Sequence, residues 1–160
     1  MSIVINKIDE LFKYTHIDEK RKVITIIFTQ YVELNCALPK GIYLNCIINE
    51  QWGYTLNIIA KKITLNYYTE INNLNCENLV VNDILDCENI EVKNDIKCHV
   101  IDSRVLRCRS IVGYRVATMK ILCKHLKLRA LSTDMYRFIY VEAYDVNERG
   151  TDYDLCEFNL

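Results

Sequence analysis

Cysteine and histidine are the residues of this chain best suited to chemistry, and the cysteines recur at a regular spacing. Five of the eight cysteines share one position of a repeated motif: Cys76, Cys87, Cys98, Cys108 and Cys123. Regularly spaced thiolates could bind zinc or exchange disulfides. Zinc sites and disulfide-exchange sites typically contain a C-x-x-C pair, and this chain has none. We therefore expect buried, reduced thiols and no metal or other cofactor, because a free Cys packs as a small hydrophobe. Such thiols are typical of a reducing, cytoplasmic compartment.

The histidines offer a second route to catalysis. His99 directly follows Cys98, and His125 lies two residues after Cys123. A nucleophilic Cys–His pair needs hydrogen-bond geometry, but adjacent residues of a strand point to opposite faces. We therefore expect both imidazoles to point outward, and the chain also lacks P-loop, GxGxxG, GxSxG and HExxH motifs. The sequence predicts a protein that is not an enzyme, and a β-helix enzyme with either histidine as its base remains an alternative.

The motif that positions these residues is ten or eleven residues long. Four consecutive copies begin at Leu74, Leu85, Ile96 and Leu106, and a fifth begins at Ile121 after a longer spacer. Apolar or small side chains recur at offsets 0, 2, 5 and 7 within each copy. An offset of two is the period of a strand, whereas an offset of five fits neither a strand nor a helix, so the chain must turn a corner. This pattern predicts a mainly β, single-domain parallel β-solenoid.

The dimensions of the expected coil follow from the motif. If two motifs make one coil, a coil has about 21 residues, and equivalent strands stack about 4.8 Å apart. The cysteines then form inward ladders, and opposite charges stack on the outside. The stacked pairs expected from this period are Cys76 with Cys98, Cys87 with Cys108, Asp86 with Arg107, and Glu88 with Arg109.

The rest of the chain is expected to extend or cap the solenoid. Residues 1–22 form an N-terminal cap with a short helix over residues 6–15, for which Asn6 is the expected N-cap. The solenoid runs over residues 23–131, and the triplets Leu34-Asn35-Cys36 and Leu44-Asn45-Cys46 are weaker copies of its motif. The spacer VGYRVATMK holds either an extra strand-and-corner unit or a protruding loop. Residues 132–160 form a capping strand over Arg137–Asp145 and an acidic tail.

The run from Leu74 to Leu131 resembles β-solenoid families built from five-residue units, namely pentapeptide-repeat proteins and bactofilin-like polymer-forming proteins. The resemblance is carried by the register I-x-C-x-x-I-x-V. The chain departs from the pentapeptide consensus because its small residue follows the central apolar residue, and it lacks the glycine-rich turns of bactofilins. The resemblance implies a polymer scaffold or a protein that mimics or obstructs nucleic-acid partners, and it assigns no functional residues.

Charge is unevenly distributed along a chain whose net charge is −1. Residues 96–131 contain nine basic residues against one acidic residue, whereas residues 74–95 are acidic. A basic band of this kind can attract a polyanion or a partner protein. The binding residues predicted from this band are Arg104, Arg107, Arg109, Arg115, Lys124, Lys127 and Arg129.

Aromatic residues outside the regular motif are candidates for recognition or for packing of the caps. Trp52 and Tyr54 interrupt the weaker upstream copies in an expected loop, and Tyr114 lies inside the basic band. Tyr136, Tyr140 and Tyr144 recur at four-residue spacing. Tyr and Trp are enriched at interaction hot spots, so we predict Trp52, Tyr54 and Tyr114 as partner contacts.

These observations predict a non-enzymatic interaction protein, an inhibitor or a scaffold, that presents charged bands to a protein partner. Nucleic-acid or other polyanion binding through residues 97–129 is the alternative. No apolar run is long enough to span a membrane and no secretory signal is expected, while exposed coil ends would allow homo-oligomers. The abundance of Ile, Asn, Lys and Tyr is typical of an AT-rich genome and indicates a low-GC bacterium, its phage or a large DNA virus as source.

Overall fold

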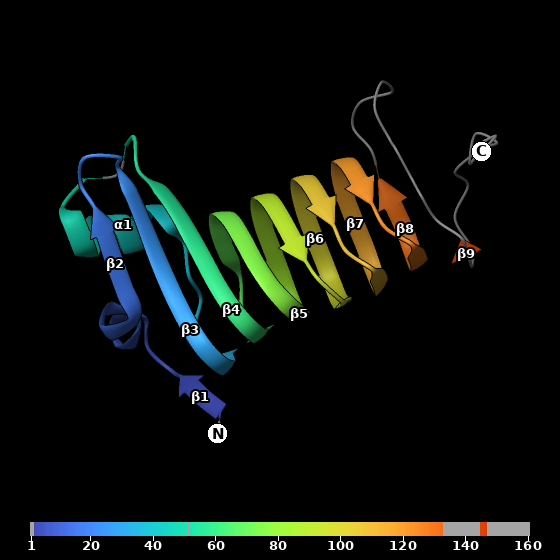
Figure 1. The fold of residues 1–160 in the computed structure, drawn as a ribbon, viewed down its shortest axis with the longest axis horizontal. Coiled ribbons are helices and arrows are strands. Elements are labelled where there is room, and N and C mark those ends of the chain that lie inside the picture. The colour runs from blue at the N-terminus through green and yellow to red at the C-terminus, as the bar shows by residue number, and fades with distance from the viewer. Residues whose placement is uncertain (1, 51, 133–144, 147–160) are drawn as a thin grey trace.

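The fold is known from a computed structural model that describes residues 2–50, 52–132 and 145–146, and it confirms the predicted parallel β-solenoid (Figure 1). Its strands pair in the order β1-β3-β4-β5-β6-β7-β8-β9, all parallel, and β2 pairs antiparallel with β3. The elements are β1 (Ser2–Ile5), the 3-10 helix η1 (Ile8–Tyr14), β2 (Thr15–Asp18), β3 (Val23–Leu34), α1 (Lys40–Ile48), β4 (Thr55–Leu65), β5 (Thr69–Val92), β6 (Asp95–Arg107), β7 (Ser110–Leu122), β8 (His125–Ser132) and β9 (Asp145–Val146).

The coil length predicted from two motif copies is wrong, because the coils are shorter. Ile96 lies opposite Ile111, which in turn lies opposite Leu126, and stacked partners in these coils are 15 positions apart. Where Asn57 lies opposite Asn73, the partners are 16 positions apart. The repeating unit is five or six residues long and buries two side chains two positions apart, and a coil closes after three units. The motif read from the sequence contains two such units, so successive copies fall on different sides of the coil.

The spacer before the fifth motif copy is one of these units. Val116 and Thr118 are buried at the two inward positions, and the segment continues strand β7 without a break. The first of the two sequence interpretations, an extra strand-and-corner unit, is therefore confirmed.

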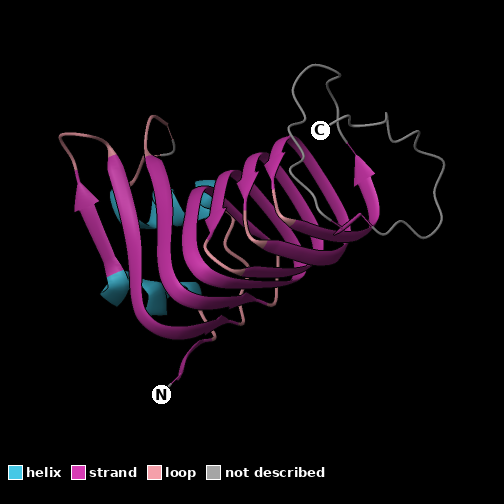
Figure 2. Ribbon diagram, turned by 45° about the vertical axis from the view of Figure 1, so that its right-hand side comes forward, coloured by secondary structure: helices cyan, strands magenta, loops and turns pink. Residues whose placement is uncertain are grey.

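The three units of a coil give the solenoid three sides, and Figure 2 shows each coil bending from one side into the next. Side 1 consists of residues 57–60, 73–76, 89–92, 105–108 and 120–123. Side 2 consists of residues 62–65, 78–81, 95–98, 110–113 and 125–128, and side 3 of residues 68–71, 84–87, 100–103 and 115–118. Each corner is named by the two sides it joins. Side 1 faces the viewer in Figure 1.

The motif cysteines point inward as predicted, but the predicted Cys–Cys ladders are wrong. Cys76 stacks on Ala60, and Cys98 stacks on Gly113, because the coil is one unit shorter than expected. The two cysteines that do meet are Cys108 and Cys123, whose side chains are neighbours one coil apart on side 1. All cysteines that the structure describes are free thiols.

The second inward position of several units carries a small side chain that can donate a hydrogen bond. The Cys87 thiol donates to the Asn89 carbonyl at 3.3 Å, and the Thr118 hydroxyl donates to the Lys120 carbonyl at 3.1 Å. Cys123 donates in the same way to the carbonyl two residues ahead. The backbone at a corner leaves the regular ladder, so a side chain that satisfies its carbonyl removes the cost of a buried unpaired group. A thiol is small enough for the interior and still a weak donor.

The N-terminal end of the core is covered by η1 and α1. Leu11 of η1 and Tyr43 of α1 are fully buried, and the Tyr43 hydroxyl hydrogen-bonds that of Thr15. A short helical cap over residues 6–15 is confirmed as the 3-10 helix. The predicted N-cap is wrong, because the cap residue is Lys7 and the Asn6 N–H instead donates to the Glu10 carboxylate at 3.1 Å.

Helix α1 was not expected from the sequence. The triplet Leu44-Asn45-Cys46, interpreted as a copy of the solenoid motif, lies inside it. The helix is inserted after β3 where the first coil would form side 3, so the chain from Val23 to its partner Thr55 is about twice as long as a later coil. A leucine and a cysteine two residues apart share a face only if the chain is an extended strand. The motif alone does not decide whether the chain is a strand or a helix.

The C-terminal cap falls mostly outside the described residues. Of the predicted strand Arg137–Asp145 only Asp145 is described, and it begins β9, which pairs parallel with the start of β8. Tyr136, Tyr140 and Tyr144 also lie outside the described part of the chain.

Candidate interaction surfaces

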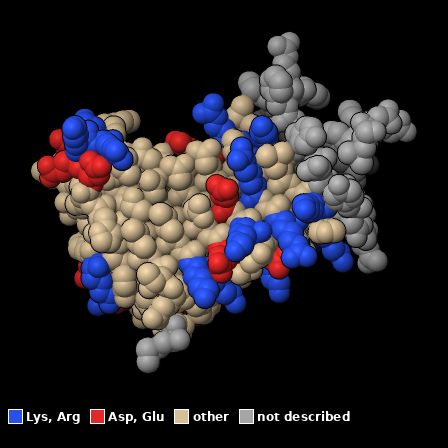
Figure 3. Space-filling view, viewed as in Figure 1, with Lys and Arg blue, Asp and Glu red and all other residues tan. Residues whose placement is uncertain are grey.

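The predicted basic band does not form a single face. The short coil distributes neighbouring cations around the whole solenoid, and Figure 3 shows Lys and Arg side chains gathered over β6–β8 on the side that faces the viewer. The band residues lie on side 1 (Arg107), at the 1–2 corner (Arg109, Lys124), on side 2 (Lys127), at the 2–3 corner (Arg129), on side 3 (Arg115) and at the 3–1 corner (Arg104).

The predicted stacking of opposite charges is wrong for the same reason. Asp86 lies opposite Asp102 rather than Arg107, and Glu88 accepts a hydrogen bond from the Asn72 amide at 2.8 Å. Ion pairs within the described ranges join Arg21 with Asp18 and Lys93 with Glu77. Both pairs are exposed, so each contributes about 0–1 kcal/mol.

Side 3 instead carries a column of carboxylates. Asp86 lies between Glu70 of the preceding coil and Asp102 of the following coil. Partial burial raises the pKa of Asp86, and the neighbouring charges of Asp102, Glu70 and Glu88 raise it further. Like charges directly opposite each other destabilise a sheet, so this column costs stability when it is ionised.

Four cations lie on the C-terminal half of side 2 and at the 1–2 corner beside it. Lys97 and Lys127 occupy one outward column, with Val112 between them. Arg109 and Lys124 stack at the adjoining 1–2 corner, where the Lys124 N–H donates to the Arg109 carbonyl at 3.1 Å. We call these four cations the basic strip. All four side chains are exposed.

An aromatic stack borders the basic strip at the 2–3 corner. The rings of His99 and Tyr114 have centroids 5.3 Å apart, and the Arg129 guanidinium lies 5.3 Å from the Tyr114 centroid on the next coil. Tyr114 remains 45% exposed within this stack. The predicted outward orientation of His99 and His125 is confirmed, since both are exposed.

The N-terminal half of side 1 is a contrasting surface without charge, which we call the uncharged face. Figure 3 shows it as the area over β3, β4 and the start of β5. Its outward residues are Thr25, Ile27, Asn57, Ile59, Asn73, Asn75 and Asn89. Ile59 is 45% exposed, and a hollow of about 230 Å³ lies beside it.

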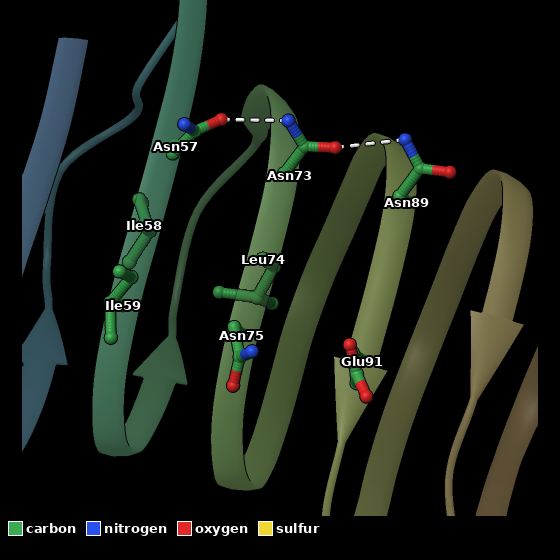
Figure 4. Close-up of a pocket in the computed structure, with 8 residues that line it drawn as sticks. All are labelled: Asn57, Ile58, Ile59, Asn73, Leu74, Asn75, Asn89 and Glu91. Atoms are coloured by element: carbon green, nitrogen blue, oxygen red, sulfur yellow. Dashed lines mark hydrogen bonds between the residues drawn. The ribbon is translucent and has the colours of Figure 1, made fainter. Parts of the chain in front are cut away.

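A ladder of asparagines holds one edge of this face, as Figure 4 shows. The Asn73 amide donates to the Asn57 side-chain oxygen at 2.7 Å, and the Asn89 amide donates to Asn73 at 2.8 Å. Ile59, Asn75 and Glu91 follow two residues further along each strand, around the hollow. Sequence reasoning missed these residues, although the equal spacing of the three asparagines is a signal for both the ladder and the coil length.

A second asparagine ladder lies at the 2–3 corner. The Asn66 amide donates to Asn35 at 2.5 Å and to the Glu33 carboxylate at 2.9 Å, and its oxygen accepts from Asn82 at 2.5 Å. Neutral amides both donate and accept, so they can stack on every coil where charges of one sign would repel. In the later coils this corner carries His99 and Tyr114 instead.

The predicted hot-spot aromatics fall in two places. Trp52 lies in the loop between α1 and β4, as expected, and is 85% exposed. Tyr54 is half-buried close to it, with the Lys22 ammonium 6.0 Å from its ring centroid. This loop leads directly into β4, the strand that carries Asn57 and Ile59 of the uncharged face. Tyr114 belongs to the opposite end of the solenoid.

The buried thiols are held in the protonated form. Burial raises the pKa of Cys76, Cys87 and Cys98 to about 12. A thiol with such a pKa carries almost no thiolate at neutral pH, and the thiolate is the nucleophile and metal ligand. Among the described residues no group of three His, Cys, Asp or Glu side chains is placed to hold a metal ion. The helices in that part of the chain are too short to cross a bilayer.

Comparison with known proteins gives no relative. The chain matches no protein-family model, no curated protein and no solved structure.

Proposed function

We propose that the chain is a non-enzymatic interaction protein whose solenoid presents the uncharged face to a protein partner. The observation that carries this proposal is the segregation of side 1, where seven outward residues on neighbouring coils include no charged side chain. Interface cores are depleted of charged residues, and their rims are polar. Charged residues surround this face, among them Lys61 and Glu77 at the 1–2 corner and Glu91, two residues after Asn89 on the same coil.

The composition of the uncharged face supports a protein partner over a polyanion. Ile27 and Ile59 lie opposite each other on β3 and β4, and both are partly exposed. Their burial would contribute apolar stabilisation, whereas a polyanion would gain no counterion release at a surface without cations. The asparagine amides can hydrogen-bond the partner at the border of this apolar pair.

The rigidity of the face favours tight binding. The ladder hydrogen bonds between Asn57, Asn73 and Asn89 fix three side chains before a partner arrives. Ordering side chains on binding costs free energy, so side chains that are already ordered lose less. Trp52, exposed in the loop that leads into β4, is a candidate anchor for the partner.

Affinity capture with side-specific variants tests this function. The bait is the full chain, used in a nuclease-treated lysate of the cell that makes it, so that nucleic acid cannot bridge bait and prey. Ile59→Glu places a charge in the centre of the face, and we expect it to lower recovery of a stoichiometric partner by about tenfold, because a buried unpaired charge is costly.

Ile84→Glu is the matched control. Ile84 is 40% exposed, close to the value for Ile59, but it lies on side 3. Recovery should be unchanged for this variant. A partner retained equally by both variants, or lost equally by both, contradicts the assignment of the binding face to side 1.

A further inference from the structure

We propose a second site, independent of the uncharged face: the basic strip and the adjoining Tyr114 stack bind single-stranded nucleic acid. The site combines four exposed cations (Lys97, Arg109, Lys124 and Lys127) with a half-exposed aromatic ring, all on consecutive coils of β6–β8. Proteins that bind single strands without sequence preference use this combination of a basic track and a stacking ring.

The distribution of charge on side 2 supports this location. Asp95 is the acidic residue among the outward positions of β6, β7 and β8 on side 2. On side 1 Arg107 lies opposite Glu91 and Lys120 lies opposite Val105. On side 3 Arg115 lies opposite Val100, beside the column of Asp86 and Asp102. The basic strip therefore places four exposed cations beside one acidic residue, and a phosphate backbone bound there would gain counterion release.

The spacing between coils sets the distances between these cations. Arg109 and Lys124 lie on adjacent coils, about 4.8 Å apart, and Lys97 and Lys127 lie two coils apart. A strand of phosphates that crosses the coils along side 2 can therefore meet both columns. Val112, exposed between the two lysines, keeps like charges from facing each other directly.

The aromatic stack supplies the preference for single strands. His99 and the Arg129 guanidinium pack against Tyr114 and fix the ring while leaving 45% of the residue exposed. A base that packs against the exposed part of this stack needs an accessible face of its own, which holds in a single strand and not inside a duplex. Cation–π contact with the guanidinium holds the ring in place.

Fluorescence anisotropy of a labelled single-stranded oligonucleotide of mixed sequence tests the site, with ssDNA and ssRNA as parallel probes. A duplex of the same sequence and heparin are the competitors. If the four cations contact phosphates, the plot of log K against log salt should have a slope of about −3, because each phosphate contact on a single strand contributes about −0.7. The single strand should bind more tightly than the duplex.

Two variants test the two parts of the site. Lys97→Gln with Lys127→Gln should make the salt slope shallower by about 1.4. Arg104→Gln with Arg115→Gln removes the same charge on the other side of the 2–3 corner, so it should leave the slope unchanged.

Tyr114→Ala should weaken single-strand binding about fivefold or more, while Tyr114→Phe retains it. Tyr67→Ala is the matched aromatic control, because Tyr67 is 52% exposed on an earlier coil.

The outcomes separate this proposal from its competitors. Equal binding of duplex, heparin and single strand, with no effect of Tyr114→Ala, would identify a general polyanion surface and overturn the single-strand assignment. Absence of binding at low salt would overturn the site altogether. Neither result affects capture of a protein partner from nuclease-treated lysate, so the uncharged face is tested separately.

Discussion

At the scale of single residues, Gly113 is the position where the narrow interior permits no side chain. It stacks on Cys98, and a Cβ at this position would lie 2.5 Å from the Cys98 carbonyl oxygen and also collide with its sulfur. Gly113→Ala should therefore lower the free energy of unfolding by about 2 kcal/mol, the usual cost of overpacking a core. Urea denaturation followed by circular dichroism measures this change.

Gly41 provides the matched control for that substitution. It lies in the first turn of α1, and nothing is within 4 Å of the position its Cβ would take. Gly41→Ala should be neutral or stabilise by about 0.5 kcal/mol, because alanine favours the helix. If both substitutions have the same effect, the close stacking of Gly113 on Cys98 is not the cause.

The cysteines make a second residue-scale prediction, which concerns reactivity. Because the pKa of Cys76, Cys87 and Cys98 is raised to about 12, these thiols should resist iodoacetamide at pH 8 in the folded protein. Cys46, exposed on α1, should be alkylated before these three. Mass spectrometry of the labelled peptides distinguishes the sites, and rapid native labelling of Cys87 would contradict its inward position. Denaturation should abolish the difference.

At the scale of elements, the asparagine ladders join coils through side chains. Asn66 connects three coils, because it donates to Asn35 and accepts from Asn82. Asn66→Asp keeps the shape, removes both N–H donors and places a carboxylate beside Glu33, so it should cost about 2 kcal/mol of unfolding free energy. The same change at exposed Asn75 should cost much less. Chemical denaturation measures both, and equal losses would mean that the ladder carries little energy.

The carboxylate column of side 3 predicts a pH dependence. The folded protein raises the pKa of Asp86 above its ordinary value of 3.8, so the folded state binds the proton more tightly than the unfolded chain does. Stability therefore falls as pH rises from 3.8 through the raised pKa, and the penalty is fully present above it. Asp86→Asn should raise stability at pH 7 by about 0.5 kcal/mol, the scale of a like-charge cross-strand pair.

Thermal unfolding at several pH values measures the effect of Asp86→Asn. The difference from the unsubstituted protein should shrink as pH falls toward 3.8. Asp95→Asn is the control, because Asp95 lies opposite Ser110 and not opposite a carboxylate. A difference that persists below pH 3.8 would mean that charge repulsion in the column is not its origin.

The sequence predicted the inward positions of the solenoid well, because alternation within a strand is a local property. Leu74, Cys76, Leu79 and Val81 are all buried, as their offsets required. The number of units in a coil depends on contacts between residues far apart in sequence, and a five-residue unit fits a coil of three sides or four. The error in this number misplaced every stacked pair, including Asp86 with Arg107. The uncharged face was missed for the same reason, since its residues become neighbours only in the shorter coil.

At the scale of the whole molecule, three sides of one solenoid carry three surfaces. Side 1 is uncharged over β3, β4 and the start of β5, side 2 is basic over β6–β8, and side 3 carries a carboxylate column. These surfaces share one core, and parallel pairing joins each strand to the next from β3 to β8. A substitution of an exposed residue on one side should therefore leave binding at another side intact, because the sites are separated by a packed interior.

The most direct test of separate binding surfaces is to measure both kinds of binding on variants of each side. Four proteins are prepared: the unsubstituted chain, Ile59→Glu on side 1, Lys97→Gln with Lys127→Gln on side 2, and Ile84→Glu on side 3. Capture of the protein partner and binding of the single-stranded oligonucleotide are measured on each. We predict that the side 1 variant loses only the protein, the side 2 variant weakens only the oligonucleotide, and the side 3 variant changes neither. Loss of both activities in any one variant that remains folded would contradict separate binding surfaces.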